Sequence, residues 1–416
     1  MASGLQMDQE TSLDLVKKGA TLLLLDVPQF TLFGIDTQMF SVGPNFKGIK
    51  MIPPGPHFIY YSSSNKEGND FSPTVGFFLT TQPAEVVVRR WHQQEEQLMK
   101  LSEDEEYRYI DAVKCFEFDQ QLGPYALDHH GAWKQLSTYI TKNVIERIEP
   151  IGGDITIAYE SGIIDTAPKT AMERCLMEQL RNSKFSNNAA KESRKRGCYY
   201  TTIPNAVKSR DVFGEELTAL NLDKTNLLES ILMKDYGGAE DLLLGELQFA
   251  FISFMMGQSL EAFLQWKALV TLLFSCTEAP LRTRTRLFSK FLRVIYFQLK
   301  HGFHKNKKDG NAADNGISVF LDDAWFSRDI FLYRLCKDFF PVVLESSVVD
   351  GDLLLWTRKL KRLLETALGW DFEDNAMDLI FEEDDEFSPV VVPSNELQQP
   401  VYGESPVNAV YLLYCY

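Results

Sequence analysis

The chain has 416 residues, a length typical of two or three domains. Hydrophobic residues make up 45% and charged residues 24%, which is ordinary for a globular protein and excludes a wholly disordered chain. The formal net charge is −16, and such a surface repels nucleic acid unless basic residues are locally concentrated. The composition therefore argues against non-specific nucleic-acid binding.

The cysteines and the first residues indicate a reducing, intracellular environment. The closest two of the six cysteines, Cys175 and Cys198, are 23 positions apart, so there is no CxxC motif and no disulfide framework. Residues 1–11 contain acids but no basic segment followed by an apolar run, so we expect no signal peptide. No apolar run approaches the roughly 20 residues that span a bilayer, and we expect no membrane association.

Residues 1–150 are predicted to form an antiparallel β-sandwich-like domain with helices at its end. Short runs rich in Val, Ile, Phe and Tyr alternate with clusters of Pro, Gly, Ser and Asn, which is typical of antiparallel strands. From Ser102, which begins a capping-box pattern with Glu105, the apolar period becomes helical. The predicted strands are Ala20–Asp26, Thr31–Asp36, Phe46–Ile52, His57–Ser62, Val75–Thr80 and Glu85–Trp91, and the predicted helices are Met7–Lys18, one after Ser102, Leu127–Leu136 and Ser137–Ile148.

Residues 151–216 are predicted to be a flexible basic linker. They have little apolar periodicity and contain a basic run at 191–196. A solvated linker is the favoured interpretation of that run, with a nuclear import signal or a phosphate-binding patch as alternatives. We expect proteases to cut first between about 155 and 210, because an unordered backbone is the preferred site of cleavage.

Residues 217–370 are predicted to form an all-α helical stack of the VHS-like or α-solenoid-like kind. Leu242–Met256 and Leu260–Phe274 are apolar almost all the way round, which is typical of helices buried between other helices. Gly257 lies between them and is predicted to be a left-handed helix cap. The fold class predicted for the whole chain is therefore α+β and multidomain. The few polar residues that interrupt the two apolar helices are Glu246, Gln248, Glu261, Gln265 and Lys267.

Residues 371–416 are predicted to be an acidic tail with a short docking strand. Nine acids and no base lie between Asp371 and Glu386, and a run of like charge repels itself and often binds a partner. Val390, Val391 and Val392 follow, bounded by Pro389 and Pro393, and this pattern favours a short extended strand. Such a strand suits β-augmentation, in which a peptide pairs with the sheet edge of a partner.

We find no sequence signature of catalysis, of a metal or of a cofactor. The common phosphate, dinucleotide, zinc-protease and hydrolase motifs are absent. His129-His130 and His301-x-x-His304 are interpreted as solvated surface residues, and Cys276 and Cys336 as core residues. His57 is predicted to begin a strand and to hydrogen-bond the turn at Pro53-Pro54-Gly55, since no acid or nucleophile is near it in sequence.

The chain resembles the Aar-two splicing-factor family along most of residues 7–395. The resemblance is specific because several long motifs occur in the same order, and it is weakest at about 155–200; we recognise no counterpart of the last fifteen or so residues. The motifs are Gly34-Ile35-Asp36, Val42 to Phe58, Tyr60 to Ser63, Gly76 to Leu79, Leu122 to Tyr125, Leu244 to Phe251, Glu261 to Lys267 and Pro389 to Val392.

The resemblance implies a non-enzymatic assembly factor of the U-five small nuclear ribonucleoprotein (snRNP) in pre-mRNA splicing. Family members bind the large central scaffold protein of the spliceosome (Prp-eight) through its RNase H-like and Jab/MPN domains, and they delay incorporation of the RNA helicase. Together with the strand pattern, this implies that Pro389, Val390, Val391 and Val392 bind the partner. It also implies a protein of the nucleus and cytoplasm, without a cofactor and without direct sequence-specific binding to nucleic acid.

Two other classes of function remain open. A helical adaptor or scaffold protein of another intracellular complex is the stronger alternative, because stacked helices are common in such proteins. An enzyme would need a converging polar cleft and an activity that depends on His57.

Overall fold

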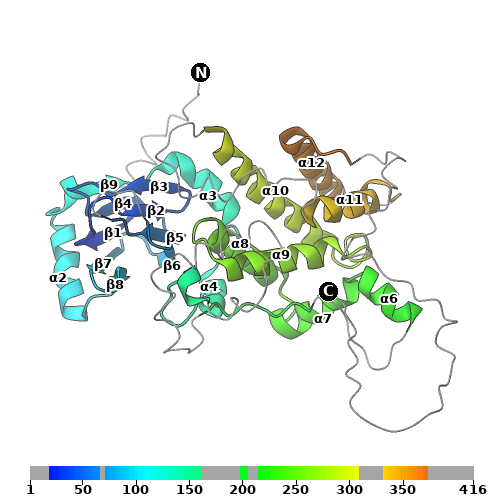
Figure 1. Ribbon diagram of the computed structural model, residues 1–416, viewed down its shortest axis with the longest axis horizontal. Coiled ribbons are helices and arrows are strands. Elements are labelled where there is room, and N and C mark those ends of the chain that lie inside the picture. Colours follow the sequence, from blue (N-terminus) through cyan, green and yellow to red (C-terminus); the bar gives the residue numbers. More distant parts are fainter. Residues whose placement is uncertain are drawn as a thin grey trace, which may run out of the picture. The chain divides into compact units, whose positions relative to one another are not determined.

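The computed structural model describes residues 18–65, 71–160, 197–204, 214–308, 331–347 and 349–372. The chain divides into two compact units, Met1–Trp370 and Asp371–Tyr416, and only residues 371 and 372 of the second unit are described. The first unit contains two β-sheets followed along the chain by helices (Figure 1). This α+β architecture with an N-terminal pair of sheets confirms the predicted fold class.

The two sheets enclose a common core of apolar side chains. One sheet has five strands in the order β8-β7-β1-β4-β9, and the other has four in the order β3-β2-β5-β6. The five-stranded sheet consists of β1 (Ala20–Leu25), β4 (Gly48–Ile52), β7 (Val86–His92), β8 (Gln97–Met99) and β9 (Leu122–Pro124). The four-stranded sheet consists of β2 (Leu32–Ile35), β3 (Gln38–Ser41), β5 (Gly55–Ser62) and β6 (Val75–Thr81).

The strand directions correct one part of the prediction. The four-stranded sheet is antiparallel throughout, as expected. The five-stranded sheet is mixed, because β1 pairs with β7 and β4 pairs with β9 in parallel. The chain visits the other sheet between β1 and β7, so these two strands are not joined by a hairpin and need not run antiparallel. The predicted strands all exist, but β3, β8 and β9 were missed because each contains at most two apolar residues.

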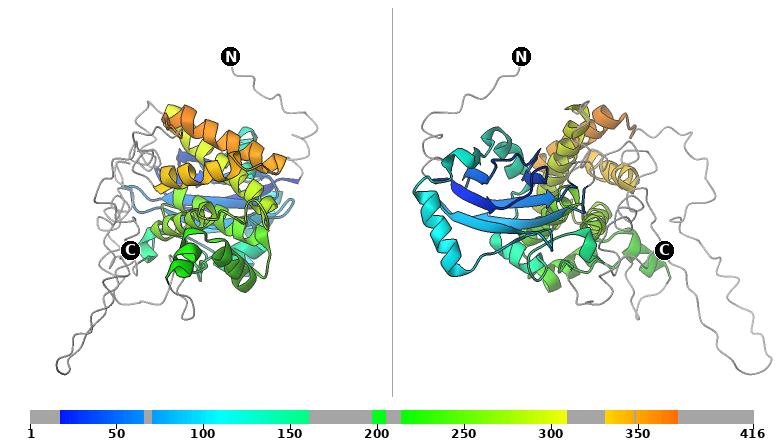
Figure 2. Two further views of the ribbon diagram at one scale, coloured as in Figure 1. Left: turned by 90° about the vertical axis from the view of Figure 1, so that its right-hand side faces the viewer. Right: turned by 60° about the vertical axis from the view of Figure 1, so that its left-hand side comes forward.

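The unbroken apolar run of β1 is explained by burial on both of its faces. Leu22 and Leu24 point into the core between the sheets, whereas Leu23 and Leu25 contact a second cluster on the outer side. That outer side is covered by α2 (Glu103–Lys114), which contributes Tyr109, Ile110 and Val113. Figure 2 shows α2 lying across the outer face of this sheet. Helix α2 begins where predicted, but the Ser102 side chain makes no capping bond to the backbone.

The remaining helices form the body of the first unit beyond the sheets. Helices α8 and α9 are buried as predicted, and the Trp266 side chain on α9 is 0% exposed. The helix predicted at Ser137–Ile148 begins only at Lys142, because residues 137–141 form a turn. The helices are α3 (His130–Leu136), α4 (Lys142–Ile148), α6 (Glu215–Leu222), α7 (Thr225–Tyr236), α8 (Glu240–Met255), α9 (Leu260–Phe274), α10 (Thr285–Lys308), α11 (Phe331–Leu344) and α12 (Gly351–Leu368).

Helix α8 packs on the outer face of the four-stranded sheet. The rings of Phe78 on β6 and Phe249 on α8 stack with centroids 4.4 Å apart. The predicted left-handed cap at Gly257 is wrong, since the positive φ of 56° belongs to Gln258. Gly257 is required for a different reason: a Cβ atom there would lie 2.5 Å from the Ser253 carbonyl oxygen and 3.3 Å from the Phe58 ring. The backbone at the end of α8 therefore selects glycine at this position, and the Phe58 ring of the sheet adds to the crowding.

Two stretches of the predicted linker are packed against the rest of the unit. Residues 155–160 include the buried side chains of Ile155 and Ile157, and Thr201 is buried within 197–204. The backbone of Ile155 also pairs with that of Gly76 on β6. Residues 161–196 and 205–213, with the basic run at 191–196, lie outside the described residues. The division into separate domains at 150 and 217 and the VHS-like or solenoid-like path of the helices remain predictions.

Candidate functional site

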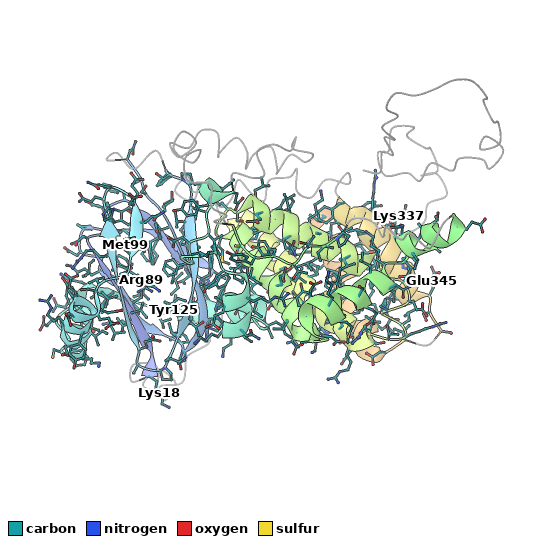
Figure 3. The ribbon with its side chains drawn as sticks, turned by 90° about the horizontal axis from the view of Figure 1, so that it is seen from below. Lys18, Arg89, Met99, Tyr125, Lys337 and Glu345 are labelled. Carbon is teal, nitrogen blue, oxygen red and sulfur yellow. The ribbon has the colours of Figure 1, made fainter. Side chains whose placement is uncertain are left out.

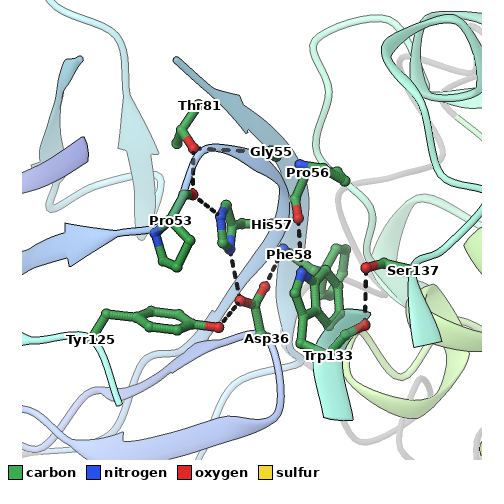
Figure 4. A network of polar contacts seen from close by, with 10 residues as sticks. All are labelled: Asp36, Pro53, Gly55, Pro56, His57, Phe58, Thr81, Tyr125, Trp133 and Ser137. Atoms are coloured by element: carbon green, nitrogen blue, oxygen red, sulfur yellow. Dashed lines mark hydrogen bonds and ion pairs between the residues drawn. The ribbon is translucent and has the colours of Figure 1, made fainter. Parts of the chain in front are cut away.

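The first candidate site is the polar network around His57, which lies between the sheets (Figure 4). The His57 ring on β5 contacts the Asp36 carboxylate through Nδ1 at 2.7 Å and the Pro53 carbonyl through Nε2 at 2.6 Å. Asp36 directly follows β2 and also accepts hydrogen bonds from the Tyr125 hydroxyl at 2.6 Å and the Phe58 N–H at 3.0 Å. Figure 3 shows the side chain of Tyr125 among the strands.

The partners of His57 determine its charge. Both ring nitrogens face oxygens that can only accept, so the ring donates twice and is an imidazolium. Burial by itself lowers the pKa of His57, but the Asp36 carboxylate and the Pro53 carbonyl outweigh burial and raise the pKa above its ordinary value. His57 and Asp36 are each 1% exposed. The network is therefore a buried ion pair whose hydrogen-bonding groups are satisfied.

This arrangement favours a structural role over a catalytic one. A general base needs an available lone pair within reach of a substrate, whereas both nitrogens of His57 are engaged and the ring is sealed from solvent. The structure confirms the predicted bond from His57 to the turn. The sequence prediction missed Asp36, which is 21 residues away, although a lone acid directly after the apolar strand Leu32–Ile35 was a usable signal.

The network extends to α3 through Trp133. The indole Nε1 donates to the Pro56 carbonyl at 2.8 Å, and the ring stacks on His57 with centroids 6.4 Å apart. Next to it, His130 is half-buried against the Tyr125 ring, and burial lowers the pKa of His130 to about 4. The interpretation of His129-His130 as a solvated pair is thus wrong for His130. Within the described ranges no cluster of His, Cys, Asp or Glu could hold a metal ion.

The second candidate site is built around Glu246, a fully buried acid on α8. Its Oε1 accepts from the Thr201 N–H at 2.8 Å and from Gln265 Nε2 at 2.8 Å. Its Oε2 accepts from the Thr201 and Tyr236 hydroxyls, both at 2.9 Å. The Arg147 guanidinium lies 4.4 Å from the centroid of the Tyr236 ring and donates to the Thr201 hydroxyl. Four donors from three other parts of the chain therefore converge on one carboxylate.

Gln248, two residues after Glu246 on α8, binds the end of α3. Its Oε1 accepts from the Tyr139 N–H at 2.7 Å, and its Nε2 donates to the Gln135 carbonyl at 3.3 Å. The neighbouring Gly245 permits this approach, since a Cβ atom there would lie 2.7 Å from the Tyr139 carbonyl oxygen. Gln248 thus joins the helix that follows the sheets to the centre of the helical region.

The N-terminus of α9 holds a third set of polar contacts. The Glu160 carboxylate accepts from the Glu261 N–H at 3.0 Å, and the Glu261 carboxylate accepts from the Cys198 N–H at 3.2 Å. Burial raises the pKa of Glu160 to about 8 despite these N–H donors. Residues 160 and 198, which bracket the undescribed segment 161–196, are therefore fastened to the same helix end.

These contacts assign a role to the polar interruptions of the two apolar helices. Glu246, Gln248, Glu261 and Gln265 all bind backbone or hydroxyl groups of other segments. A buried polar side chain is costly unless it is paired, so each of these residues specifies which segment lies where. The sequence showed the interruptions but did not indicate their partners, which are between 10 and 113 positions away.

The other predicted site residues have different outcomes. Pro389, Val390, Val391 and Val392 lie outside the described residues, as does the acidic run after Phe372. Cys276 and Cys336 are buried, which confirms their interpretation as core residues. None of the helices that the structure describes has the length and apolar content to cross a membrane.

Two family models and several known proteins match the chain. Residues 18–150 match the family model for the AAR2 N-terminal domain, and residues 200–373 match that for the AAR2 C-terminal repeat region. The chain is 30% identical over 393 residues to the human protein AAR2 homolog, covering 89% of this chain and 94% of that protein. It is 31% identical over 371 residues to the Caenorhabditis elegans homolog, covering 86% and 95%. It is 24% identical over 402 residues to the A1 cistron-splicing factor AAR2 of Saccharomyces cerevisiae, covering 91% and 99%.

Proposed function

Since the chain belongs to the AAR2 family, we propose that it acts in pre-mRNA splicing as a non-enzymatic assembly factor of the U-five snRNP. In this proposal it binds the large spliceosomal scaffold protein through that protein's RNase H-like and Jab/MPN domains. Its presence delays incorporation of the helicase into the particle. The protein then works in the nucleus and cytoplasm and needs no cofactor.

One observation carries the proposal: the chain matches both AAR2 domain models in order and covers nearly the full length of the relatives. The yeast relative, which is named a splicing factor, is covered over 99% of its length. A match of that extent supports a shared role for the whole chain more strongly than a match to a single domain would. In this interpretation both domains are needed for the role that the relatives have.

The buried networks also support a binding protein over an enzyme. Two buried ionisable groups of the described residues, His57 and Glu246, have their hydrogen-bonding partners inside the protein. Groups used in catalysis have to face a substrate. A folded unit fastened by such networks suits a protein that holds a partner in one arrangement.

An affinity purification of the full-length chain from whole-cell extract tests the proposal. Recovery of the spliceosomal scaffold protein without the helicase is the expected result. Recovery of vesicle-coat or other cytoplasmic complexes in its place would support the alternative, a helical adaptor. A direct binding assay with the purified RNase H-like and Jab/MPN domains then separates direct from indirect association, and absence of binding to both domains would refute the proposal.

The tail strand provides the second part of the test. We propose that residues 389–392 add a strand to a sheet edge of one of the two scaffold domains. Removing residues 387–416 should then weaken binding to that domain while leaving the stability of residues 18–372 unchanged. Unchanged binding would show that the folded part of the chain is sufficient.

A further inference from the structure

Helices α10 and α12 concentrate positive charge in an otherwise acidic protein. Between Thr285 and Lys300 the sequence of α10 contains four basic residues and no acidic residue. Helix α12 contains four basic residues and two acidic ones. The two helices pack along each other (Figures 1 and 2). An acidic protein can attract nucleic acid only where basic residues are locally concentrated. This pair of helices provides such a concentration.

The basic residues of α10 lie on one face of the helix. At roughly 100° per residue, Arg286, Lys290, Arg293 and Lys300 fall within an arc of about 80°. The opposite arc carries the buried side chains of the core, among them Leu287, Phe291 and Ile295. With a rise of 1.5 Å per residue, the row from Arg286 to Lys300 is about 21 Å long. This row is a straight line of charge that points away from the core.

Aromatic rings hold several of these cations in place. The Arg293 guanidinium lies 5.6 Å from the centroid of the Trp356 ring, and the Lys359 ammonium lies 4.4 Å from the same centroid. The Lys300 ammonium lies 5.8 Å from the centroid of the Tyr296 ring. Both rings are half-buried in the seam between α10 and α12. A long cationic side chain that is already positioned loses less conformational entropy when it binds an anion.

Several basic residues of α10 and α12 are paired within the protein and others are not. Lys290 pairs with Asp241 at 2.7 Å and Lys361 pairs with Glu365 at 3.6 Å. Arg293 and Lys359 are exposed, and within the described part of the chain no carboxylate oxygen lies within 4 Å of their nitrogens. These two residues and the exposed Arg286 thus retain charge for an external partner.

We propose that the α10–α12 basic face, defined by Arg286, Arg293, Trp356 and Lys359, binds the phosphate backbone of single-stranded RNA without sequence specificity. The row of cations runs in a straight line, as does the charge of an extended polynucleotide. The half-buried rings of Tyr296 and Trp356 lie among these cations, and cations combined with aromatic rings are the means by which proteins bind single-stranded nucleic acid, which favours RNA over an acidic peptide. This inference goes beyond the proposed function and does not depend on it.

Fluorescence anisotropy with the full-length protein and a labelled 12-nucleotide oligouridylate tests the proposal at 50 mM NaCl. Binding should weaken with salt, with a slope of about −2 in log K against log salt if three phosphates are contacted. The double substitution Arg293→Gln/Lys359→Gln should weaken binding at least fivefold. The matched control Arg108→Gln/Lys134→Gln changes the net charge equally at exposed sites on α2 and α3 and should change binding less than twofold.

A second variant keeps the test independent of folding. Arg286→Gln leaves the aromatic seam intact and should weaken binding about twofold with an unchanged thermal midpoint. No binding at 50 mM NaCl, or equal losses in the test and control variants, would overturn the proposal. Displacement of the RNA by polyglutamate of the same length and at equal concentration would assign the face to an acidic protein segment and would also overturn it.

Discussion

The two parts of the first unit each bury a carboxylate, and they satisfy it by different means. Asp36, between the sheets, is paired with the His57 imidazolium and with groups of residues 58 and 125. Glu246, between the helices, is paired with neutral donors of residues 201, 236 and 265. The first network joins elements of the strand-rich part to one another, whereas the second joins helices α7, α8 and α9 to the segment 197–204. A buried acid therefore marks a position where the fold is specified by pairing and not by apolar contact alone.

The largest effect is expected for Glu246→Ala, which removes the shared acceptor of four hydrogen bonds. Buried donors left without an acceptor cost about 1–3 kcal/mol each when water does not reach them. We expect a loss of about 4 kcal/mol in the free energy of unfolding, measured by urea denaturation, since partial access of water reduces the sum.

Glu246→Gln is the matched control for that substitution. It keeps the volume and one acceptor oxygen, and the hydroxyls of Thr201 and Tyr236 can turn to accept from its amide. It should cost about 1–2 kcal/mol. Equal stability of the alanine variant and the wild type would show that the Glu246 network does not fasten the helices.

A smaller loss is expected for His57→Ala, which leaves the Asp36 carboxylate buried with two neutral donors. Removing one partner of a buried ion pair costs about 3–5 kcal/mol, and the bonds from Tyr125 and Phe58 place this case at the lower end, about 3 kcal/mol. Asp36→Asn combined with His57→Ala should cost less than the sum of the single changes, because the double variant leaves no unpaired charge. Additive losses would contradict the ion pair.

The same ion pair predicts a pH dependence. The pKa of His57 is raised in the folded state above 6.5, so its contribution to stability is complete below pH 6.5 and is lost as the pH rises through the folded-state pKa. The difference in free energy of unfolding between the wild type and His57→Ala should therefore shrink from pH 6 to pH 9. A difference that grows over this range would show that His57 is neutral in the folded protein.

Substitutions in the tail strand test whether the tail contributes to binding of the scaffold protein in addition to the two folded regions. Val391→Pro removes a backbone donor and fixes φ, so we expect at least a tenfold loss of affinity for the scaffold protein with an unchanged midpoint of unfolding. Val391→Ala keeps the donor and should lose only two- to threefold. Titration of the two purified scaffold domains measures both values. Normal binding by the proline variant, or unfolding of the helical region, would exclude the proposed strand.

The smallest effect is expected for the acidic run. Replacing the acids of residues 371–386 by Asn and Gln should slow association with the scaffold protein a few-fold at low salt and hardly at all at high salt, because the Debye length at physiological ionic strength is about 8 Å. Stopped-flow association rates at two salt concentrations measure this. Equal association rates of the wild type and the variant at low salt would show that the acidic run does not contribute to the encounter with the scaffold protein.

Much of the fold could be predicted from the sequence because its signals are local. Alternating apolar runs predicted every strand longer than four residues, and all-round apolarity predicted the burial of α8 and of Trp266. The parallel pairings of β1 with β7 and of β4 with β9 were missed, since strand neighbours are decided by the path of the chain between the sheets. No periodicity encodes that path.

Of the buried polar networks, the sequence revealed only single polar residues that interrupt or follow apolar segments. Glu246 and Gln248 were visible as polar residues in an apolar helix, and Asp36 as an acid at the end of an apolar strand. Their partners are selected by the packing of whole elements, and nothing at residues 57, 139 or 201 reveals them. The basic residues of α10 were likewise hidden by the net charge of −16. Only the geometry of the helix and its packing against α12 show that they lie on one face.

Hydrogen exchange of single backbone amides tests most directly the claim that Glu246 fastens residues 197–204 to the helices while Asp36 acts within the strand-rich part. The Thr201 amide donates to Glu246 and the Phe58 amide donates to Asp36, so both should exchange slowly in the wild-type protein. In Glu246→Ala, which leaves the Thr201 amide without this acceptor, the acceleration of exchange should be at least tenfold greater at Thr201 than at Phe58. Fast exchange of Thr201 in the wild type, or equal acceleration at both amides in the variant, would contradict the account.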